Sequence, residues 1–353
     1  MSVQVDPAVH GAFDFAELER LGLDPDAVLD FSVNSNPFGP APLVREAIRS
    51  TPLERYPDRE SIALRRALSK QLDVLPEQIL AGNGAAELIQ LTAFACLQQG
   101  EHALVVGPTF GEYERCIWLA GGILHHWRAV PENGFIPDLE EIEKTLTARK
   151  MRLAFICNPN NPTGQVIPLQ AVEKWSRTFP DTLFVVDEAY LAFVPGMYSV
   201  VSLHRKNILI LRSMTKDYAL AGLRLGYAVG DENVIAALAD LRPAWNVNAL
   251  AQAAGLAALQ DETCLSDGLR KLQSEKEALV SGLKELGYEP VPSQTHYFLL
   301  PVEEGARFRR KLLKKGILVR DCASFGLPSF IRIATRTSEE NARLLHAMGE
   351  MRS

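Results

Sequence analysis

Six short and almost continuously apolar runs constrain the fold of this chain most strongly. Such runs suit strands that are buried on both faces, as in a parallel sheet covered by helices. Helical patterns separate them, for example at residues 85–97 and 169–178. The alternation predicts an α/β domain with a mostly parallel sheet flanked by helices, which we place at residues 39–249. The runs are residues 78–80, 103–106, 153–157, 183–186, 208–211 and 225–229.

The pattern changes after this region. An Ala-rich helical stretch is followed by a long amphipathic helix, three short strands and a last helix that starts at Ser338. This order predicts a smaller α+β domain at residues 250–353. The first 38 residues contain one helical stretch, at 13–21, and we expect them to form an N-terminal arm packed on the small domain.

Composition narrows the class of protein. A 353-residue chain with a formal charge of −6 and 47% hydrophobic residues is typical of a globular protein without general affinity for nucleic acid. No apolar run reaches the roughly 18 residues of a membrane-spanning helix, and the N-terminus does not resemble a secretory signal. The 5 cysteines are scattered without a CxxC pair. We therefore expect a cytoplasmic protein with no metal site and no membrane or nucleic-acid partner.

A lysine directly follows one of the buried strands. Lys216 stands after the run 208–211, where its amine, once desolvated, could form a Schiff base with a carbonyl group. Ser213 and Arg224 lie close enough in the chain to bind a phosphate beside it. Taken alone, this segment could also be a loop with an exposed lysine.

A carboxylate ends another strand. Asp187 follows the run 183–186, and a buried carboxylate there requires a cationic partner such as a protonated pyridine nitrogen. That pair would keep the ring an electron sink. Taken alone, an aspartate at a strand end is more often a helix N-cap.

Two loops complete the pattern. The segment 158–164, Asn-Pro-Asn-Asn-Pro-Thr-Gly, is a rigid turn whose amides can hydrogen-bond a phenolate oxygen. The segment 82–87 is a glycine-rich bend that enters a helix and directs backbone N–H groups toward an anion. Since the spacing G-x-G-x-x-G is absent, this bend does not indicate a nicotinamide nucleotide.

Together these four segments resemble the signature of fold-type-I pyridoxal-phosphate enzymes, the class I/II aminotransferase superfamily. The resemblance extends from about residue 10 to the C-terminus. It implies pyridoxal 5′-phosphate as cofactor, and a homodimer whose active sites are shared between subunits. Lys216 would bind the cofactor and move protons, Asp187 would pair with the pyridine nitrogen, Asn161 and Tyr190 would bond the phenolic oxygen, and Phe110 would stack on the ring.

The resemblance also assigns the phosphate site. Ser213, Arg224 and the backbone of Ala85 and Ala86 would hold the cofactor phosphate, and Tyr56 would reach it from the neighbouring subunit.

Substrate residues follow from two groups within the superfamily, threonine-phosphate decarboxylase of cobalamin biosynthesis and histidinol-phosphate aminotransferase. Both act on small phosphorylated amines. The resemblance implies that Arg332 binds the substrate carboxylate and that Arg320 binds the substrate phosphate. It also implies three further substrate contacts, His10, Asn36 and Arg336.

The choice between the two rests on short segments. His10-Gly11, the segment 31–37 around Asn36, and the segment 334–337 around Arg336 resemble the decarboxylase. Against this, Asp217 replaces an aromatic residue common in the decarboxylases, and Ala221-Gly222 is closer to the aminotransferase. The expected reaction is therefore decarboxylation of L-threonine O-3-phosphate to aminopropanol phosphate, a lyase reaction through a quinonoid intermediate. The alternative is histidinol-phosphate aminotransferase or another small class I/II aminotransferase.

Overall fold

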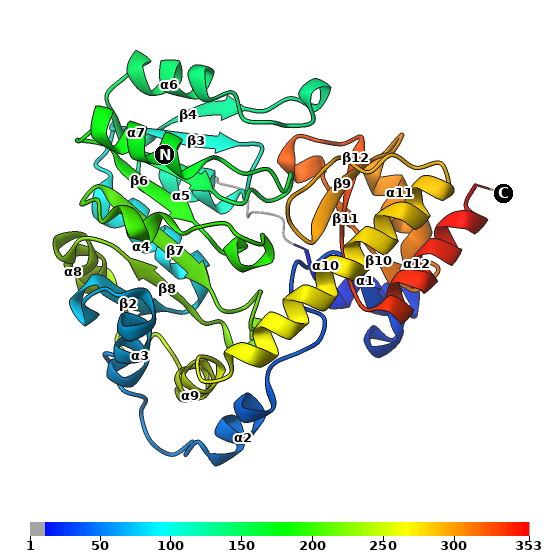
Figure 1. Cartoon of the computed structure of the whole chain (residues 1–353), viewed down its shortest axis with the longest axis horizontal. Coiled ribbons are helices and arrows are strands. Elements are labelled where there is room, and N and C mark those ends of the chain that lie inside the picture. Colours follow the sequence, from blue (N-terminus) through cyan, green and yellow to red (C-terminus); the bar gives the residue numbers. More distant parts are fainter. Residues whose placement is uncertain (1–10, 353) are drawn as a thin grey trace.

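The computed structural model describes residues 11–352, and its largest element is a seven-stranded sheet in the order β2-β8-β7-β6-β5-β3-β4 (Figure 1). Within it β8 is antiparallel to its neighbours β2 and β7, and the other pairs are parallel. The predicted α/β class with a mostly parallel sheet is confirmed. The strands are β2 (Ile79–Gly82), β3 (His102–Gly107), β4 (Ile123–Arg128), β5 (Met151–Cys157), β6 (Leu183–Asp187), β7 (Ile208–Ser213) and β8 (Gly226–Val229).

Strand β4 was not expected from the sequence. It reads Ile-Leu-His-His-Trp-Arg and forms the edge of the sheet, where none of its side chains is fully buried. A half-exposed edge strand does not need the continuous apolar run that indicated the other strands.

Helices cover both faces of this sheet. Alternate side chains of each strand point to opposite faces, so along β3 Leu104 and Val106 pack on one side and Ala103 and Val105 on the other. The first face is covered by α2 (Pro42–Ser50), α3 (Ile62–Leu72), α6 (Leu139–Ala148), α7 (Leu169–Thr178) and α9 (Ala249–Ala258), and the second by α4 (Gly84–Cys96), α5 (Glu112–Leu119) and α8 (Glu232–Leu241). Connecting turns of 3-10 helix lie at Pro25–Ala27, Pro76–Gln78, Pro131–Asn133, Leu191–Phe193, Val200–Leu203, Ala221–Leu223 and Ala323–Phe325.

A smaller unit lies beside the large one, on the right in Figure 1. Its antiparallel sheet has the order β11-β12-β9, and a parallel pair joins β1 to β10. Ile331 and Ile333 point into its core, whereas Arg332 between them points to the opposite face, as the strand alternation predicts. The elements are β1 (Leu29–Asp30), β9 (Tyr297–Pro301), β10 (Ile317–Leu318), β11 (Arg320–Asp321), β12 (Phe330–Ala334), α1 (Phe15–Leu21), α10 (Glu262–Glu285), α11 (Gly305–Leu313) and α12 (Ser338–Glu350).

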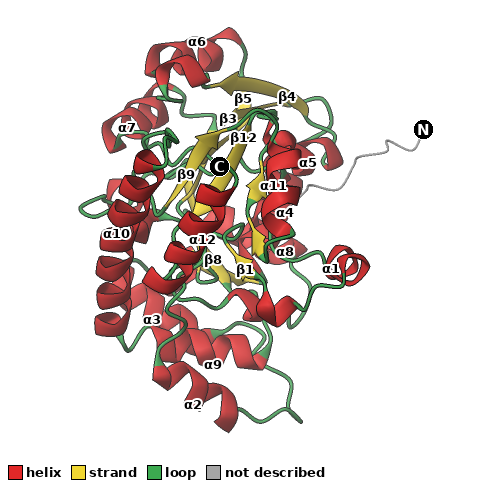
Figure 2. Cartoon of the chain, turned by 90° about the vertical axis from the view of Figure 1, so that its right-hand side faces the viewer, coloured by secondary structure: helices red, strands yellow, loops and turns green. Residues whose placement is uncertain are grey.

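The segment before α2 packs on the small unit in the part of the chain that is described. Glu17 of α1 forms an ion pair with Arg309 of α11, and Leu18 packs on Leu313 and Leu318. Figure 2 shows α1 on the small-unit side, away from α2 and α9.

Helix α9 belongs to the core of the large unit. Its residues Ala251, Ala254 and Ala257 pack with α2 and α3 on the large sheet. The boundary between the large and the small unit was expected at residues 249–250. We propose instead that it lies after α9, within α10.

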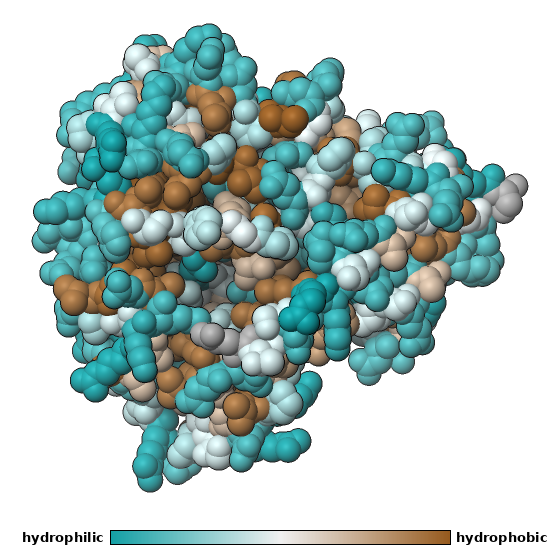
Figure 3. All heavy atoms as spheres, viewed as in Figure 1, coloured by the Kyte–Doolittle hydropathy of each residue, from teal (hydrophilic) through white to brown (hydrophobic). Residues whose placement is uncertain are grey.

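Hydrophilic side chains cover most of the rim of the face shown in Figure 3, and apolar side chains reach that surface mainly over the large unit. Within residues 11–352, no helix combines the length and the hydropathy needed to cross a bilayer.

The large core gives a stability prediction. Phe184 of β6 is fully buried, so the change Phe184→Ala should lower the free energy of unfolding by about 3–5 kcal/mol. The matched change Phe94→Ala, on the outer side of α4 where the ring is 41% exposed, should cost less than about 1 kcal/mol. Urea titration of both variants measures the difference, and equal losses would contradict this view of the core.

Candidate active site

A cavity opens at the carboxyl ends of the parallel strands, which is where α/β sheets bind ligands. Its lining comes from the loops after β3, β5, β6 and β7 and from the start of α4. The residues expected from the sequence to hold a cofactor within one subunit all lie in this lining: Ala85, Ala86, Phe110, Asn161, Asp187, Tyr190, Ser213, Lys216 and Arg224.

Lys216 projects into this cavity from the turn after β7. Burial, together with the cations Arg332 and Arg224, lowers the pKa of its amine to about 8, and Asp187 opposes this shift. An amine with this pKa is partly neutral near pH 7, and the neutral form is the nucleophile that attacks an aldehyde.

Asp187 lies at the inner end of the cavity. Its Oδ2 accepts a hydrogen bond from the Tyr113 hydroxyl at 2.7 Å, and its Oδ1 accepts one from the Ala189 backbone N–H at 3.0 Å. Burial raises the pKa of this carboxyl, and the two donors only partly offset that effect. Each oxygen keeps a further lone pair, so the carboxylate can still bind a cationic N–H group.

The other end of the cavity presents donors to an anion. Helix α4 starts at Gly84, where a Cβ would lie 2.8 Å from Nη2 of Arg224, so the glycine lets this guanidinium approach the helix N-terminus. A Cβ on Gly226 would lie 2.8 Å from the backbone nitrogen of Ala85. The N–H groups of the first helical turn, the Ser213 hydroxyl and Arg224 together provide donors that could hold a phosphate.

These groups fit pyridoxal phosphate. The donor set at α4 suits its phosphate, the buried carboxylate of Asp187 suits a protonated ring nitrogen, and the Lys216 amine suits its aldehyde. One continuous cavity connects Asp187 with the donors at the start of α4, and Phe110 is part of its lining.

The cavity continues toward the small unit, where it is lined by Asn34, Phe325 and two arginines. Arg320 of β11 and Arg332 of β12 are directly opposite each other in the antiparallel pair, and both are buried. Like charges in such positions repel, and a bound anion would relieve the repulsion. Burial lowers the pKa of Arg320 to about 10, and Arg332 adds to this effect.

Arg332 also joins the two units. Its Nη1 donates to Oδ1 of Asn161 in the loop after β5, and its Nη2 donates to the backbone oxygen of Ser32. Among the described residues, its Nε has no hydrogen-bond partner.

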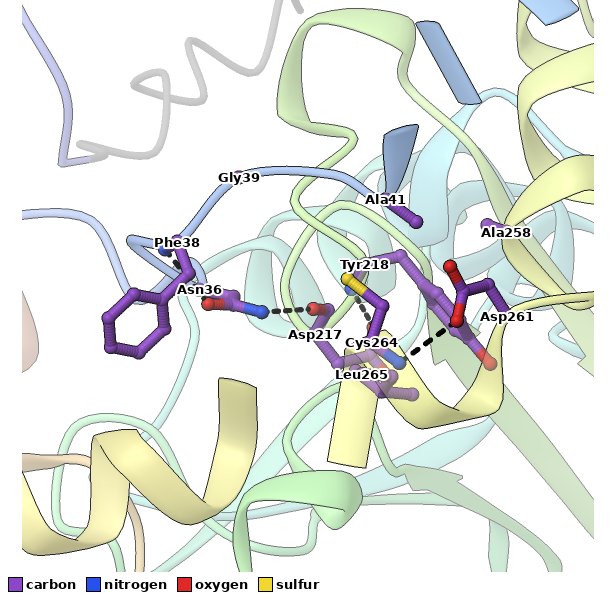
Figure 4. Close-up of a pocket in the computed structure, with 10 residues that line it drawn as sticks. All are labelled: Asn36, Phe38, Gly39, Ala41, Asp217, Tyr218, Ala258, Asp261, Cys264 and Leu265. Atoms are coloured by element: carbon purple, nitrogen blue, oxygen red, sulfur yellow. Dashed lines mark hydrogen bonds between the residues drawn. The ribbon is translucent and has the colours of Figure 1, made fainter. Parts of the chain in front are cut away.

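Two expected substrate residues lie outside this cavity. Asn36 donates from Nδ2 to the backbone oxygen of Asp217 at 3.0 Å and accepts from the Phe38 backbone N–H at 3.1 Å, so it supports the lysine loop (Figure 4). Arg336 forms an ion pair with Glu340 at 2.8 Å and donates to the backbone oxygen of Asp30 at 2.9 Å. Both side chains are committed to the protein itself rather than directed at a substrate.

Two further residues expected at the site, Tyr56 and His10, are not among the described residues that line the cavity. Tyr56 is 80% exposed and stacks on Trp245, with ring centroids 4.5 Å apart. His10 lies outside the described residues.

Sequence reasoning did not identify two residues of the site. Tyr113 binds Asp187 and stacks on Phe155, and its position three residues after Phe110 was an available signal. Asn34 lines the substrate side of the cavity, whereas the sequence suggested Asn36 from the same segment.

The similarity of the chain to known proteins agrees with this geometry. The family model "Aminotransferase class I and II" matches residues 26–348. The histidinol-phosphate aminotransferase of Moorella thermoacetica is 36% identical over 92% of this chain and 85% of the relative. That of Caldicellulosiruptor saccharolyticus is 32% identical over 98% of both chains. The solved structure of histidinol-phosphate aminotransferase from Sinorhizobium meliloti in complex with pyridoxal-5′-phosphate has a TM-score of 0.87 at 25% identity, covering 99% of this chain and 98% of that one.

These relatives contradict the expectation of a decarboxylase. The expected lyase reaction and the expected role in cobalamin biosynthesis are therefore wrong as well. Relatives that match over most of their length are named histidinol-phosphate aminotransferases. The segments 31–37 and 334–337 gave the wrong reaction because Asn36 and Arg336 in them are paired with the protein itself and do not record which bond is broken.

The depressed pKa of Lys216 predicts how the apoprotein takes up pyridoxal phosphate. Because the neutral amine reacts, the uptake rate should rise about tenfold per pH unit below about pH 8 and level off above it. Stopped-flow absorbance measures the rate, and borohydride reduction followed by peptide mapping should place the label on Lys216. The Lys216→Ala protein is the control and should retain no covalent label. A rate independent of pH between about 6 and 8 would contradict the prediction.

Proposed function

Because this chain belongs to the class I and II aminotransferases and is a pyridoxal-phosphate enzyme, we propose that it transfers an amino group between histidinol phosphate and 2-oxoglutarate. The observation that carries this proposal is the pair of buried arginines, Arg320 and Arg332, directly opposite each other in the cavity that also contains Lys216. A substrate that enters must be anionic, and histidinol phosphate and 2-oxoglutarate both are.

Two fixed cations suit both substrates. Arg332 lies next to Asn161 and close to the cofactor end, so it takes the carboxylate beside the reacting carbon of glutamate or 2-oxoglutarate. Arg320 lies beyond it, with Ser324 at 2.7 Å, and takes the more distant anion, which is the phosphate of histidinol phosphate or the second carboxylate of glutamate. A guanidinium binds either group through two parallel N–H donors.

The remaining residues handle protons. Bound pyridoxal phosphate supplies an electron sink next to the amine carbon. The Lys216 amine, with its pKa near 8, removes the proton from that carbon and returns one to it. Asp187 holds a proton at the ring nitrogen, and Tyr113 fixes the carboxylate that does so. Tyr190 and Asn161 line the cavity and would bond the phenolic oxygen of the cofactor.

A homodimer is part of this proposal. Leu53 and Tyr56 are 78% and 80% exposed in the segment between α2 and α3, and Trp245 beside Tyr56 is 47% exposed. Large apolar side chains gathered in this way are typical of a surface that another subunit covers. Tyr56 would then donate to the cofactor phosphate of the partner.

The activity itself is tested with histidinol phosphate and 2-oxoglutarate, scored as glutamate formed. The change Arg320→Ala should lower kcat/KM for histidinol phosphate by about 30- to 1000-fold, which corresponds to about 2–4 kcal/mol, and should reduce the preference for histidinol phosphate over histidinol. Arg310→Ala is the matched control, because this arginine on α11 is exposed and makes only a long ion pair with Glu304 at 3.8 Å. Carbon dioxide released from threonine phosphate, with no glutamate formed from histidinol phosphate, would overturn the proposal.

The shared site is tested with mixed subunits. Tyr56→Phe and Lys216→Ala proteins should each be weakly active or inactive, and mixing them should restore part of the activity, because a hybrid dimer contains one site with both native residues. Sedimentation measures the oligomeric state of each protein. A fully active monomer would rule out the shared site.

A further inference from the structure

Asn34 is buried at the substrate end of the cavity without a hydrogen-bond partner. The residue is 2% exposed and lines the same cavity as Lys216 and Arg332. Neither atom of its amide makes a hydrogen bond within the described residues. A buried amide left in this way lowers the stability of the folded protein, because each unpaired group has lost its hydrogen bonds to water. By contrast, the buried amide of Asn158 is paired at both atoms with the backbone of Ile167.

His296 lies close to the backbone of Asn34 and is fully buried against Phe193, with ring centroids 3.9 Å apart. Among the described residues, neither of its ring nitrogens has a hydrogen-bond partner. Burial lowers the pKa of His296 well below its usual value, and the cations Arg332, Lys276 and Lys216 lower it further, so this ring is neutral.

On the cavity side the amide has polar neighbours. Burial raises the pKa of the Tyr190 hydroxyl, and Arg332 and the Asn34 amide oppose that rise, so the amide lies near this hydroxyl. Arg332 holds the backbone oxygen of Ser32, two residues before Asn34, and keeps its own Nε without a partner. The amide and the guanidinium thus line one cavity, and among the described residues each keeps an N–H group without a partner.

We propose that the Asn34 amide contacts both substrates and exchanges its donor and acceptor between them. In one orientation Nδ2 donates to the carboxylate that Arg332 binds. After rotation about the last side-chain bond, Oδ1 accepts from an N–H group of an imidazole ring. An asparagine amide carries both functions on one terminal group, and the barrier to this rotation is low. One cavity can then serve two substrates that differ in the group presented at this position.

The two parts of the inference depend on different premises. The contact with an imidazole rests on the proposed function, whereas the contact with a carboxylate requires only that a dicarboxylate such as glutamate binds beside Arg332. The two half-reactions can be followed separately in single turnovers from the absorbance of the bound cofactor, with glutamate in one and histidinol phosphate in the other.

The test uses two substitutions at Asn34 in the cofactor-loaded enzyme. Asn34→Leu removes both functions and should lower kcat/KM about 10- to 100-fold in both half-reactions. Asn34→Asp keeps the acceptor, loses the donor and adds a negative charge. It should therefore weaken the glutamate half-reaction at least about tenfold more than the histidinol-phosphate half-reaction. Calorimetric binding of maleate, a dicarboxylate that cannot react, should weaken in parallel with the glutamate half-reaction.

The matched control is Asn36→Asp. It makes the same change two residues away, where the amide is already paired with the protein backbone. This variant should lose thermal stability and affect both half-reactions by similar factors. Asn34→Ser replaces Asn34→Leu if the leucine protein does not fold.

Three outcomes are decisive. Asn34→Leu with both half-reactions within about twofold of the parent would overturn the inference, and so would Asn34→Asp with unchanged maleate binding. A parent enzyme that reacts with glutamate but not with histidinol phosphate would instead remove the proposed function and the imidazole contact. In that case maleate binding and the glutamate half-reaction would still decide the carboxylate contact.

Discussion

The buried carboxylate of Asp187 is the constraint on which the site depends. It ends β6 in the middle of the sheet, and burial raises its pKa while the Tyr113 hydroxyl and the Ala189 N–H group stabilise its charged form. Such a group needs a cation to remain ionised. A protonated pyridine nitrogen meets that need, and Lys216, whose own pKa is depressed by the same burial, is then free to react and to move protons. Burial in one cavity therefore prepares an acid and a base together.

The second constraint is positive charge, and it comes from the small unit. β11 and β12 place Arg320 and Arg332 directly opposite each other, and Arg332 crosses to Asn161 in the large unit. The reacting groups belong to the seven-stranded sheet, while the groups that select an anionic substrate belong to the three-stranded one. A substrate can be converted only where the two units meet, so their relative position controls both binding and orientation.

The reaction that the enzyme catalyses could not be predicted by comparing short motifs. The segments around Asn36 and Arg336 favoured a decarboxylase, yet in the structure Asn36 supports the lysine loop and Arg336 is paired with Glu340. Their similarity to another group of enzymes therefore reflects support of the local backbone rather than contact with the reacting bond. The bond that breaks is decided by the orientation of the substrate above the ring, which depends on how far Arg320 and Arg332 lie from Lys216.

The sequence by itself determined the parallel sheet, because strands buried on both faces require apolar runs. It also placed Asp187 and Lys216 after such strands, and the resemblance to fold-type-I enzymes indicated the other cofactor residues. Only the tertiary structure revealed β4, whose half-exposed edge position needs no apolar run. It also decided that Asn34 rather than Asn36 lines the cavity, since the Asn36 side chain is bonded to Asp217, 181 residues away, and the backbone of Ser32 is bonded to Arg332, 300 residues away. Local patterns record burial along one element, whereas contacts between distant elements decide which side of a loop faces the substrate.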